Sequence, residues 1–139
     1  MNQAEFALDP QLAGDTVAVA DLALARVLLN DDANYPWLIL VPRRPALVEI
    51  IDLEENEQVQ LMAEVARAAQ VLKAATACDK LNIAAIGNVV AQLHVHIVAR
   101  RRGDTAWPKP VWGHSPARPY DEAAREQFAA KLRRGLELA

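Results

Sequence analysis

Apolar and β-branched runs near the start of the chain predict three strands of one antiparallel sheet. Residues 16–20 and 24–29 have the composition of strands, and the short connection around Asp21 favours an antiparallel hairpin. Residues 37–41, Trp-Leu-Ile-Leu-Val, are apolar at every position, which is typical of a central strand buried on both faces. Pro42 ends this strand, because proline has no backbone N–H to donate to a neighbour.

Two further strands are predicted at residues 80–86 and 89–99, and they would form a second antiparallel hairpin. The later strand alternates between polar and apolar side chains around its histidines. Because successive side chains of a strand point to opposite faces, we expect Gln92, His94 and His96 in a row on one face. The apolar residues between them would then face the core.

Apolar residues at spacings of three and four predict helices between and after these strands. Residues 9–14 predict a short helical turn capped by Asp9, and residues 120–136 predict an amphipathic C-terminal helix. A long helix of about 20–25 residues is expected from Asp52, which forms a capping-box pattern with Glu55. Its apolar positions are Leu61, Met62, Val65, Ala69 and Leu72. Its polar positions, mostly on the other side, are Glu57, Gln60, Glu64, Arg67 and Lys73.

The predicted elements indicate an α+β fold, with an antiparallel sheet of about five strands, one long helix and a C-terminal helix. Residues 1–139 fit a single domain. After residue 100 the character changes, because closely spaced prolines preclude regular structure over residues 107–116. Trp107 and Trp112 lie in this segment, where they either hold it to the body of the protein or form a wall of a binding pocket.

Charge and composition narrow the classes of function. The net charge of −3 argues against general nucleic-acid binding, although Arg43-Arg44 and residues 100–102 form basic clusters that could contact a phosphate. No apolar run approaches the roughly 18 residues of a membrane-spanning helix, and a signal-peptide pattern is missing. We therefore expect a cytoplasmic protein without a membrane partner. Cys78 is the only cysteine, which excludes an intrachain disulfide and a cysteine-rich metal site.

Two of the three histidines, His94 and His96, are separated by a single residue. Either one alone is more often a hydrogen-bonded structural residue than a ligand or a catalyst. A zinc ion is one alternative for the pair, since alternate strand positions can supply two imidazoles to one metal. A third ligand is missing, because Cys78 lies at a helix end and His114 lies in the irregular segment. We expect neither a metal nor another cofactor.

The sequence around the histidines resembles a known family. Residues 87–98, Gly-Asn-Val-Val-Ala-Gln-Leu-His-Val-His-Ile-Val, are similar to the signature of the histidine triad (HIT) family, His-φ-His-φ-His-φ-φ, in which φ is apolar. The resemblance covers about residues 17–100 and is strongest to the fragile-histidine-triad branch. The chain departs from the pattern at two positions. Gln92 replaces the first histidine of the triad, and Trp37 stands where that branch often has a histidine.

This resemblance implies a HIT-like fold and a nucleotide hydrolase. His94 would attack the α-phosphorus and form a nucleotidyl-imidazole intermediate that water then hydrolyses. It must therefore be neutral, with its other ring nitrogen donating to a backbone carbonyl. His96 would donate to a nonbridging phosphate oxygen, Asn88 would contact the phosphate or the bridging oxygen, and Asn30 would lie near the ribose. Gln92 could contribute hydrogen bonds only, because an amide cannot take up a proton.

A dinucleoside polyphosphate is the expected substrate, with Arg43 among the phosphate contacts and Trp107 and Trp112 against the base. An aminoacyl nucleotide or a phosphoramidate would need less positive charge. The resemblance also implies a homodimer through a sheet edge and the long helix, where Ala66 and Ala69 would permit close contact. The alternative to an enzyme is a non-catalytic nucleotide-binding or interaction module with a degraded triad, and a metal-dependent hydrolase ranks third.

Overall fold

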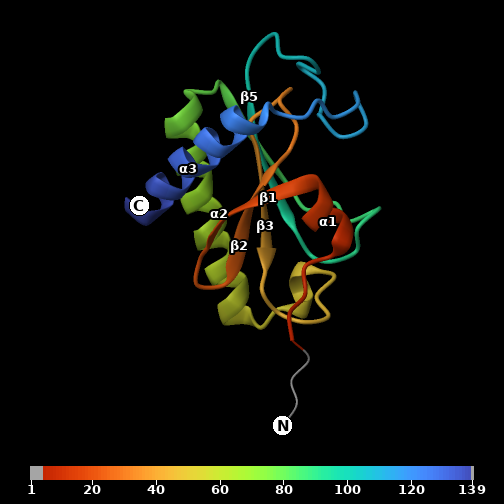
Figure 1. Cartoon of the computed structure of the whole chain (residues 1–139). Coiled ribbons are helices and arrows are strands. Elements are labelled where there is room, and N and C mark those ends of the chain that lie inside the picture. Colours follow the sequence, from red (N-terminus) through yellow and green to blue (C-terminus); the bar gives the residue numbers. More distant parts are fainter. Residues whose placement is uncertain (1–4, 139) are drawn as a thin grey trace.

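The computed structural model describes residues 5–138, and its centre is a five-stranded antiparallel sheet in the order β1-β2-β3-β5-β4 (Figure 1). The strands are β1 (Thr16–Asp21), β2 (Ala25–Asn30), β3 (Trp37–Pro42), β4 (Lys80–Ala84) and β5 (Val95–Arg100). The helices are α1 (Pro10–Asp15), the short 3-10 helix η1 (Ile50–Asp52), α2 (Glu55–Thr76) and α3 (Glu122–Leu138). The predicted α+β fold is confirmed.

Both predicted hairpins are present, as β1–β2 and β4–β5. β3 lies in the middle of the sheet and all of its residues are buried, as its wholly apolar sequence predicts. The histidine strand is shorter than predicted, because β5 begins only at Val95. Residues 85–94 form an irregular connection instead. Near its end, the backbone N–H of Leu93 donates to the carbonyl of Leu47 and not to β4.

The two faces of the sheet are covered differently. α2 and α3 pack against one face, where Leu40 and Ile97 belong to the larger apolar cluster (Figure 1). On the other face, Ile39 and Val98 belong to a smaller cluster with residues of α1 and of the irregular segment after β5. His96 lies directly opposite Ile39 in the β3–β5 register, so its side chain is on this second face.

The start of the long helix differs from the prediction. α2 has the expected length, 22 residues, but begins at Glu55, and its N-cap residue Glu54 makes no side-chain capping bond. Asp52 caps η1 instead, because its carboxylate accepts the backbone N–H groups of Val48 and Glu49. These two hydrogen bonds stabilise the charged form and lower the pKa of the Asp52 carboxyl below its ordinary value.

Glu64 occupies an environment opposite to the one that the helical pattern predicts, whereas Met62 is an apolar position that either the core or a partner helix could cover. Glu64 is 3% exposed, and its carboxylate accepts the backbone N–H groups of Leu24 and Ala25 at the turn between β1 and β2. Met62 is 65% exposed and is therefore not part of the core of this chain. The helical pattern puts Glu64 on the polar side because the N–H groups of Leu24 and Ala25, which its carboxylate meets, lie about 40 residues away in the sequence.

The other helices follow the sequence more closely. Asp9 caps α1 by accepting the N–H of Gln11, as predicted. α3 buries Ala129, Leu132 and Leu136 along one side. Within residues 5–138, no helix combines the length and the apolar character needed to cross a membrane.

Candidate active site

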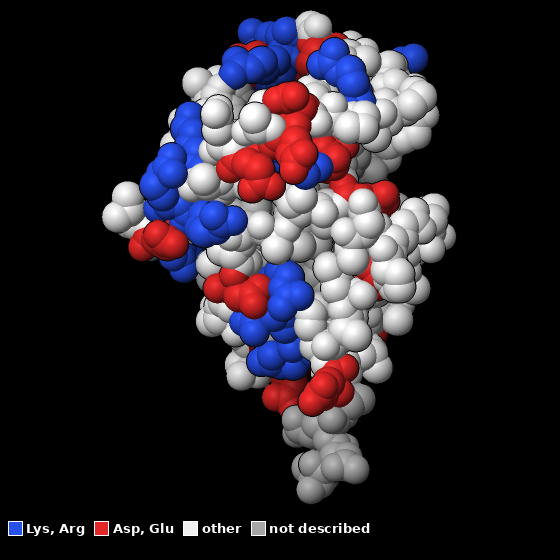
Figure 2. Space-filling model, in the orientation of Figure 1, with Lys and Arg blue, Asp and Glu red and all other residues white. Residues whose placement is uncertain are grey.

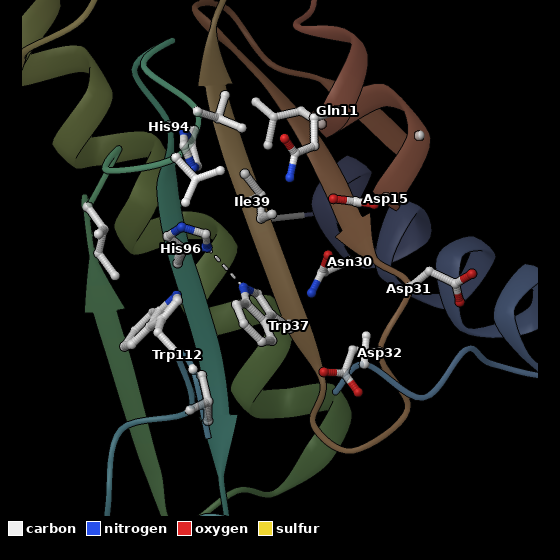
Figure 3. Close-up of a pocket in the computed structure, with 18 of the residues that line it drawn as sticks. Gln11, Asp15, Asn30, Asp31, Asp32, Trp37, Ile39, His94, His96 and Trp112 are labelled. Atoms are coloured by element: carbon white, nitrogen blue, oxygen red, sulfur yellow. Dashed lines mark hydrogen bonds between the residues drawn. The ribbon is translucent and has the colours of Figure 1, made fainter. Parts of the chain in front are cut away.

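A cavity of about 620 Å³ opens on the second face of the sheet, between α1, the connection before β5 and the irregular segment after it. His94, His96 and Trp112 line one side of this cavity, and Asp15, Asn30 and Asp32 line the opposite side (Figure 3). The side chains thus come from segments far apart in the sequence. The sheet holds them in place, because β2, β3 and β5 are neighbours in it.

His94 lies just before β5 and is 6% exposed. Its Nδ1 atom is 2.6 Å from the backbone carbonyl oxygen of Gln92. A carbonyl oxygen can only accept a hydrogen bond, so Nδ1 carries a proton, and in the neutral form of the ring Nε2 carries the free lone pair. This is the arrangement that the sequence analysis requires of a nucleophilic imidazole.

His96 follows in β5, with its ring centroid 4.8 Å from that of His94. Its Nδ1 atom is 3.0 Å from the indole Nε1 of Trp37 on β3. Burial, together with the neighbouring His94, lowers the pKa of His96 from 6.5 to about 4. His96 is therefore neutral at physiological pH.

Gln92 does not lie in a row with the two histidines, which corrects the strand prediction. Its Oε1 accepts the backbone N–H of Asp9 and its Nε2 donates to the carbonyl of Ala7, both at 2.8 Å. The strand alternation fails here because Gln92 precedes β5. Its side chain lines a separate hollow of about 250 Å³ beside η1, which shares His94 with the main cavity. In this position Gln92 fixes the segment that leads into α1.

Asn88, Asn30 and Trp112 all line the main cavity. Asn88 is exposed and follows Gly87, whose φ of +71° favours glycine at this turn. Trp112 packs edge-on against His96, with ring centroids 5.4 Å apart. Of the two alternatives for this tryptophan, the structure therefore favours a pocket wall.

Arg43 and Trp107 lie elsewhere, contrary to their predicted place against the substrate. The Arg43 guanidinium donates to the carbonyl of Leu22 at the β1–β2 turn. Trp107 packs on the guanidinium of Arg100, which is 1% exposed and forms a two-bond ion pair with Asp104. Both arginines are used to hold chain segments together, and neither lines the cavity.

The structure adds acidic residues that the sequence analysis did not single out. Asp15, Asp31 and Asp32 line the cavity, whereas none of the described residues lining it is Lys or Arg. In Figure 2, basic side chains gather at the left over α3, whereas the part of the view over α1 is mostly uncharged. Asp31 and Asp32 could have been predicted from the sequence, because they follow Asn30 directly at the end of a predicted strand.

Most of this acidic side is already hydrogen-bonded. Asp31 accepts from the backbone of Tyr120 and pairs with Arg125. Asp32, which is 4% exposed, accepts from the backbone of Asn34 and Arg118. Between residues 5 and 138, no three His, Cys, Asp or Glu side chains are grouped so that they could hold a metal ion.

Comparison with known proteins finds a family match and similar solved structures over most of the chain. The model of the HIT domain family matches residues 12–103. A histidine triad protein from Bradyrhizobium japonicum is 54% identical, with a TM-score of 0.93, and the match covers 96% of this chain and 99% of that one. Among curated proteins, none matches.

Two further solved structures are similar over nearly their whole length. A HIT protein from Sinorhizobium meliloti is 43% identical, with a TM-score of 0.91 and coverage of 94% of this chain and 96% of that one. A histidine triad protein from Marinobacter aquaeolei is 41% identical, with a TM-score of 0.94 and coverage of 97% and 98%.

Proposed function

The chain belongs to the HIT domain family, and from that premise we propose that it transfers a nucleotidyl group from a nucleoside phosphate derivative to water through a covalent bond to His94. The observation that carries this proposal is the hydrogen bond from His94 Nδ1 to the carbonyl of Gln92. It leaves the Nε2 lone pair free inside a cavity large enough for a nucleotide.

The proposed reaction has two steps at phosphorus. In the first, His94 Nε2 forms a bond to the α-phosphorus while the bond to the leaving group breaks, and the leaving group departs with the electron pair. In the second, water attacks the phosphorus and gives up a proton to the solvent, and the phosphorus–nitrogen bond breaks, which returns the lone pair to Nε2. His96 Nε2–H donates to a nonbridging oxygen as negative charge grows there, and Asn88 contacts the phosphate.

The charges of the cavity favour a substrate with few phosphates. A dinucleoside polyphosphate, the substrate implied by the fragile-histidine-triad resemblance, needs cations along its phosphate chain. Arg43 bonds to the β1–β2 turn and Arg100 to Asp104, while the cavity itself carries Asp15 on an exposed position. An aminoacyl nucleotide or a nucleoside phosphoramidate places a single phosphoryl group beside the histidines and suits this lining better. Asn30 lines the same cavity and would contact the ribose.

The experiment compares three substrates: a nucleoside phosphoramidate, an acyl nucleotide and a dinucleoside polyphosphate. The wild type should hydrolyse the first two faster, and His94→Ala should abolish turnover. His114→Ala is the matched control, because His114 is exposed and does not line the cavity. Mass spectrometry of the quenched reaction should find a nucleotidyl adduct on His94.

The outcomes separate the candidate functions. Full turnover by His94→Ala would contradict the covalent mechanism. Tight nucleotide binding without turnover of any of the three substrates would support the non-catalytic binding module instead. A higher kcat/KM for the dinucleoside polyphosphate would overturn the substrate preference but leave the mechanism intact.

We also propose a homodimer formed through α2 and the edge strand β4. Val59 and Met62 of α2 and Ile83 of β4 are large apolar side chains that are at least half exposed. Ala66 is exposed as well, whereas Ala69 is buried in the core and cannot reach a partner. Light scattering should give the mass of a dimer, and Met62→Glu should shift the protein to a monomer. A monomeric wild type at micromolar concentration would refute the proposal.

A further inference from the structure

Trp37 makes the hydrogen bond that determines which ring nitrogen of His96 carries the proton. Trp37 lies on β3 and pairs with Val98 of β5, so it is the diagonal neighbour of His96 on the same face of the sheet. Its Nε1 is 3.0 Å from His96 Nδ1, and in Figure 3 a dashed line joins the indole nitrogen of Trp37 to the imidazole of His96. Trp37 and His96 are both 8% exposed, so water has little access to this bond.

The indole group can act in only one way in this pair. An indole N–H donates and never accepts, so His96 Nδ1 must be the acceptor and carry a lone pair. The single proton of the neutral imidazole is then on Nε2. Either the other tautomer or the imidazolium would place two N–H groups face to face in a buried site. Trp37 therefore disfavours both.

Neighbouring aromatic rings hold this geometry. Tyr35 packs edge-on against Trp37 with centroids 6.4 Å apart, and Trp112 packs edge-on against Trp37 at 5.9 Å. Trp112 also contacts His96. A tryptophan enclosed on several sides cannot rotate its N–H away from His96 without breaking these contacts.

We propose that Trp37 is a positioning residue that fixes His96 as a permanent neutral Nε2–H donor to the phosphate oxygen. The part that concerns phosphate rests on the proposed function, whereas the tautomer is a property of the protein alone. A histidine at this position could donate or accept and could change its charge. Trp37 can do neither, so it makes the donor state of His96 independent of proton exchange with residue 37.

The direct test is the tautomer of His96 in the substrate-free protein, measured by the ¹⁵N chemical shifts of its ring nitrogens. In the wild type, Nδ1 should have the shift of an unprotonated nitrogen and Nε2 that of a protonated one. Trp37→Phe should give averaged shifts, because the donor to Nδ1 is gone. Tyr35→Phe is the matched control, since it alters the same aromatic cluster but keeps the Trp37–His96 bond, and it should leave the shifts unchanged.

A second replacement guards against misfolding of the phenylalanine variant. In β-(3-benzothienyl)alanine a sulfur atom replaces the indole N–H while the shape of the side chain is kept. Its introduction at Trp37 should likewise average the His96 shifts. Unchanged shifts in both replacements, or a wild type with the proton on Nδ1, would overturn the role of Trp37.

The kinetic measurement connects the tautomer to the reaction. Loss of the fixed donor should lower kcat by about fivefold, which is the effect of one neutral hydrogen bond, with KM nearly unchanged. Averaged shifts without any fall in kcat would overturn the catalytic part of the proposal. A wild type that hydrolyses none of the three substrates would refute the proposed function but would leave the tautomer result standing.

Discussion

Glu64 offers the sharpest test of how the fold is held together. Its carboxylate lies in the core at 3% exposure and accepts the N–H groups of Leu24 and Ala25 at 2.9 and 2.7 Å. These two contacts join α2 to the β1–β2 turn, which otherwise has two neighbouring N–H groups facing the protein interior. Glu64→Gln keeps the size of the side chain but replaces one accepting oxygen by an NH₂ group.

The expected loss of stability follows from the hydrogen bonds. One N–H, of Leu24 or Ala25, would face the new NH₂ group and lose its partner. A hydrogen bond to a charged group contributes about 1.5–3 kcal/mol, and a buried N–H left without a partner costs about 1–3 kcal/mol. The neutral amide recovers part of this, because it is less costly to bury than a carboxylate. We expect a net loss of about 2–3 kcal/mol in the free energy of unfolding.

Thermal and urea unfolding followed by circular dichroism measure this loss. For a chain of 139 residues, 2–3 kcal/mol corresponds to a fall in Tm of about 7–10 °C. Glu55→Gln is the matched control, because Glu55 is an exposed residue of the same helix, and its stability should change by less than about 0.5 kcal/mol. If Glu64→Gln unfolded like Glu55→Gln, the buried carboxylate would not be the anchor of the turn.

Three further predictions concern stability. The pKa of His96 is lower in the folded protein than in the unfolded chain, so the unfolded chain takes up a proton first as the pH falls. The free energy of unfolding should be highest above pH 6.5 and fall by about 3 kcal/mol as the pH approaches 4. In urea unfolding, His96→Gln should lessen this loss. Gly135→Ala should cost about 1 kcal/mol, because its Cβ would be 2.7 Å from Val71 Cγ1, and an equal cost in a Val71→Ala background would refute this contact. Arg100→Lys should cost about 2–3 kcal/mol, because an ammonium cannot keep both bonds to Asp104, and an unchanged Tm would contradict this.

Much of the fold could be predicted because it depends on local pattern. The strand-like composition of residues 16–20 and 24–29, the wholly apolar residues 37–41 and the period of 3.6 in α2 and α3 each reflect which residues of an element are buried. Where a side chain bonds to a distant backbone group, local pattern misleads. Asp52 caps η1 rather than α2, and Glu64 is buried on a face that its neighbours in sequence mark as polar.

The candidate site divides in the same way. By itself, the sequence indicated His94 and His96, because two imidazoles one residue apart in a known family pattern are a local signal. Only the tertiary structure decided their protonation, since the carbonyl of Gln92 and the indole of Trp37 set which ring nitrogen carries the proton. The tertiary structure also shows that Arg43, expected among the phosphate contacts, bonds to the β1–β2 turn and does not line the cavity. The charge of a pocket is a sum over segments that meet only when the chain is folded, and no stretch of the sequence contains it.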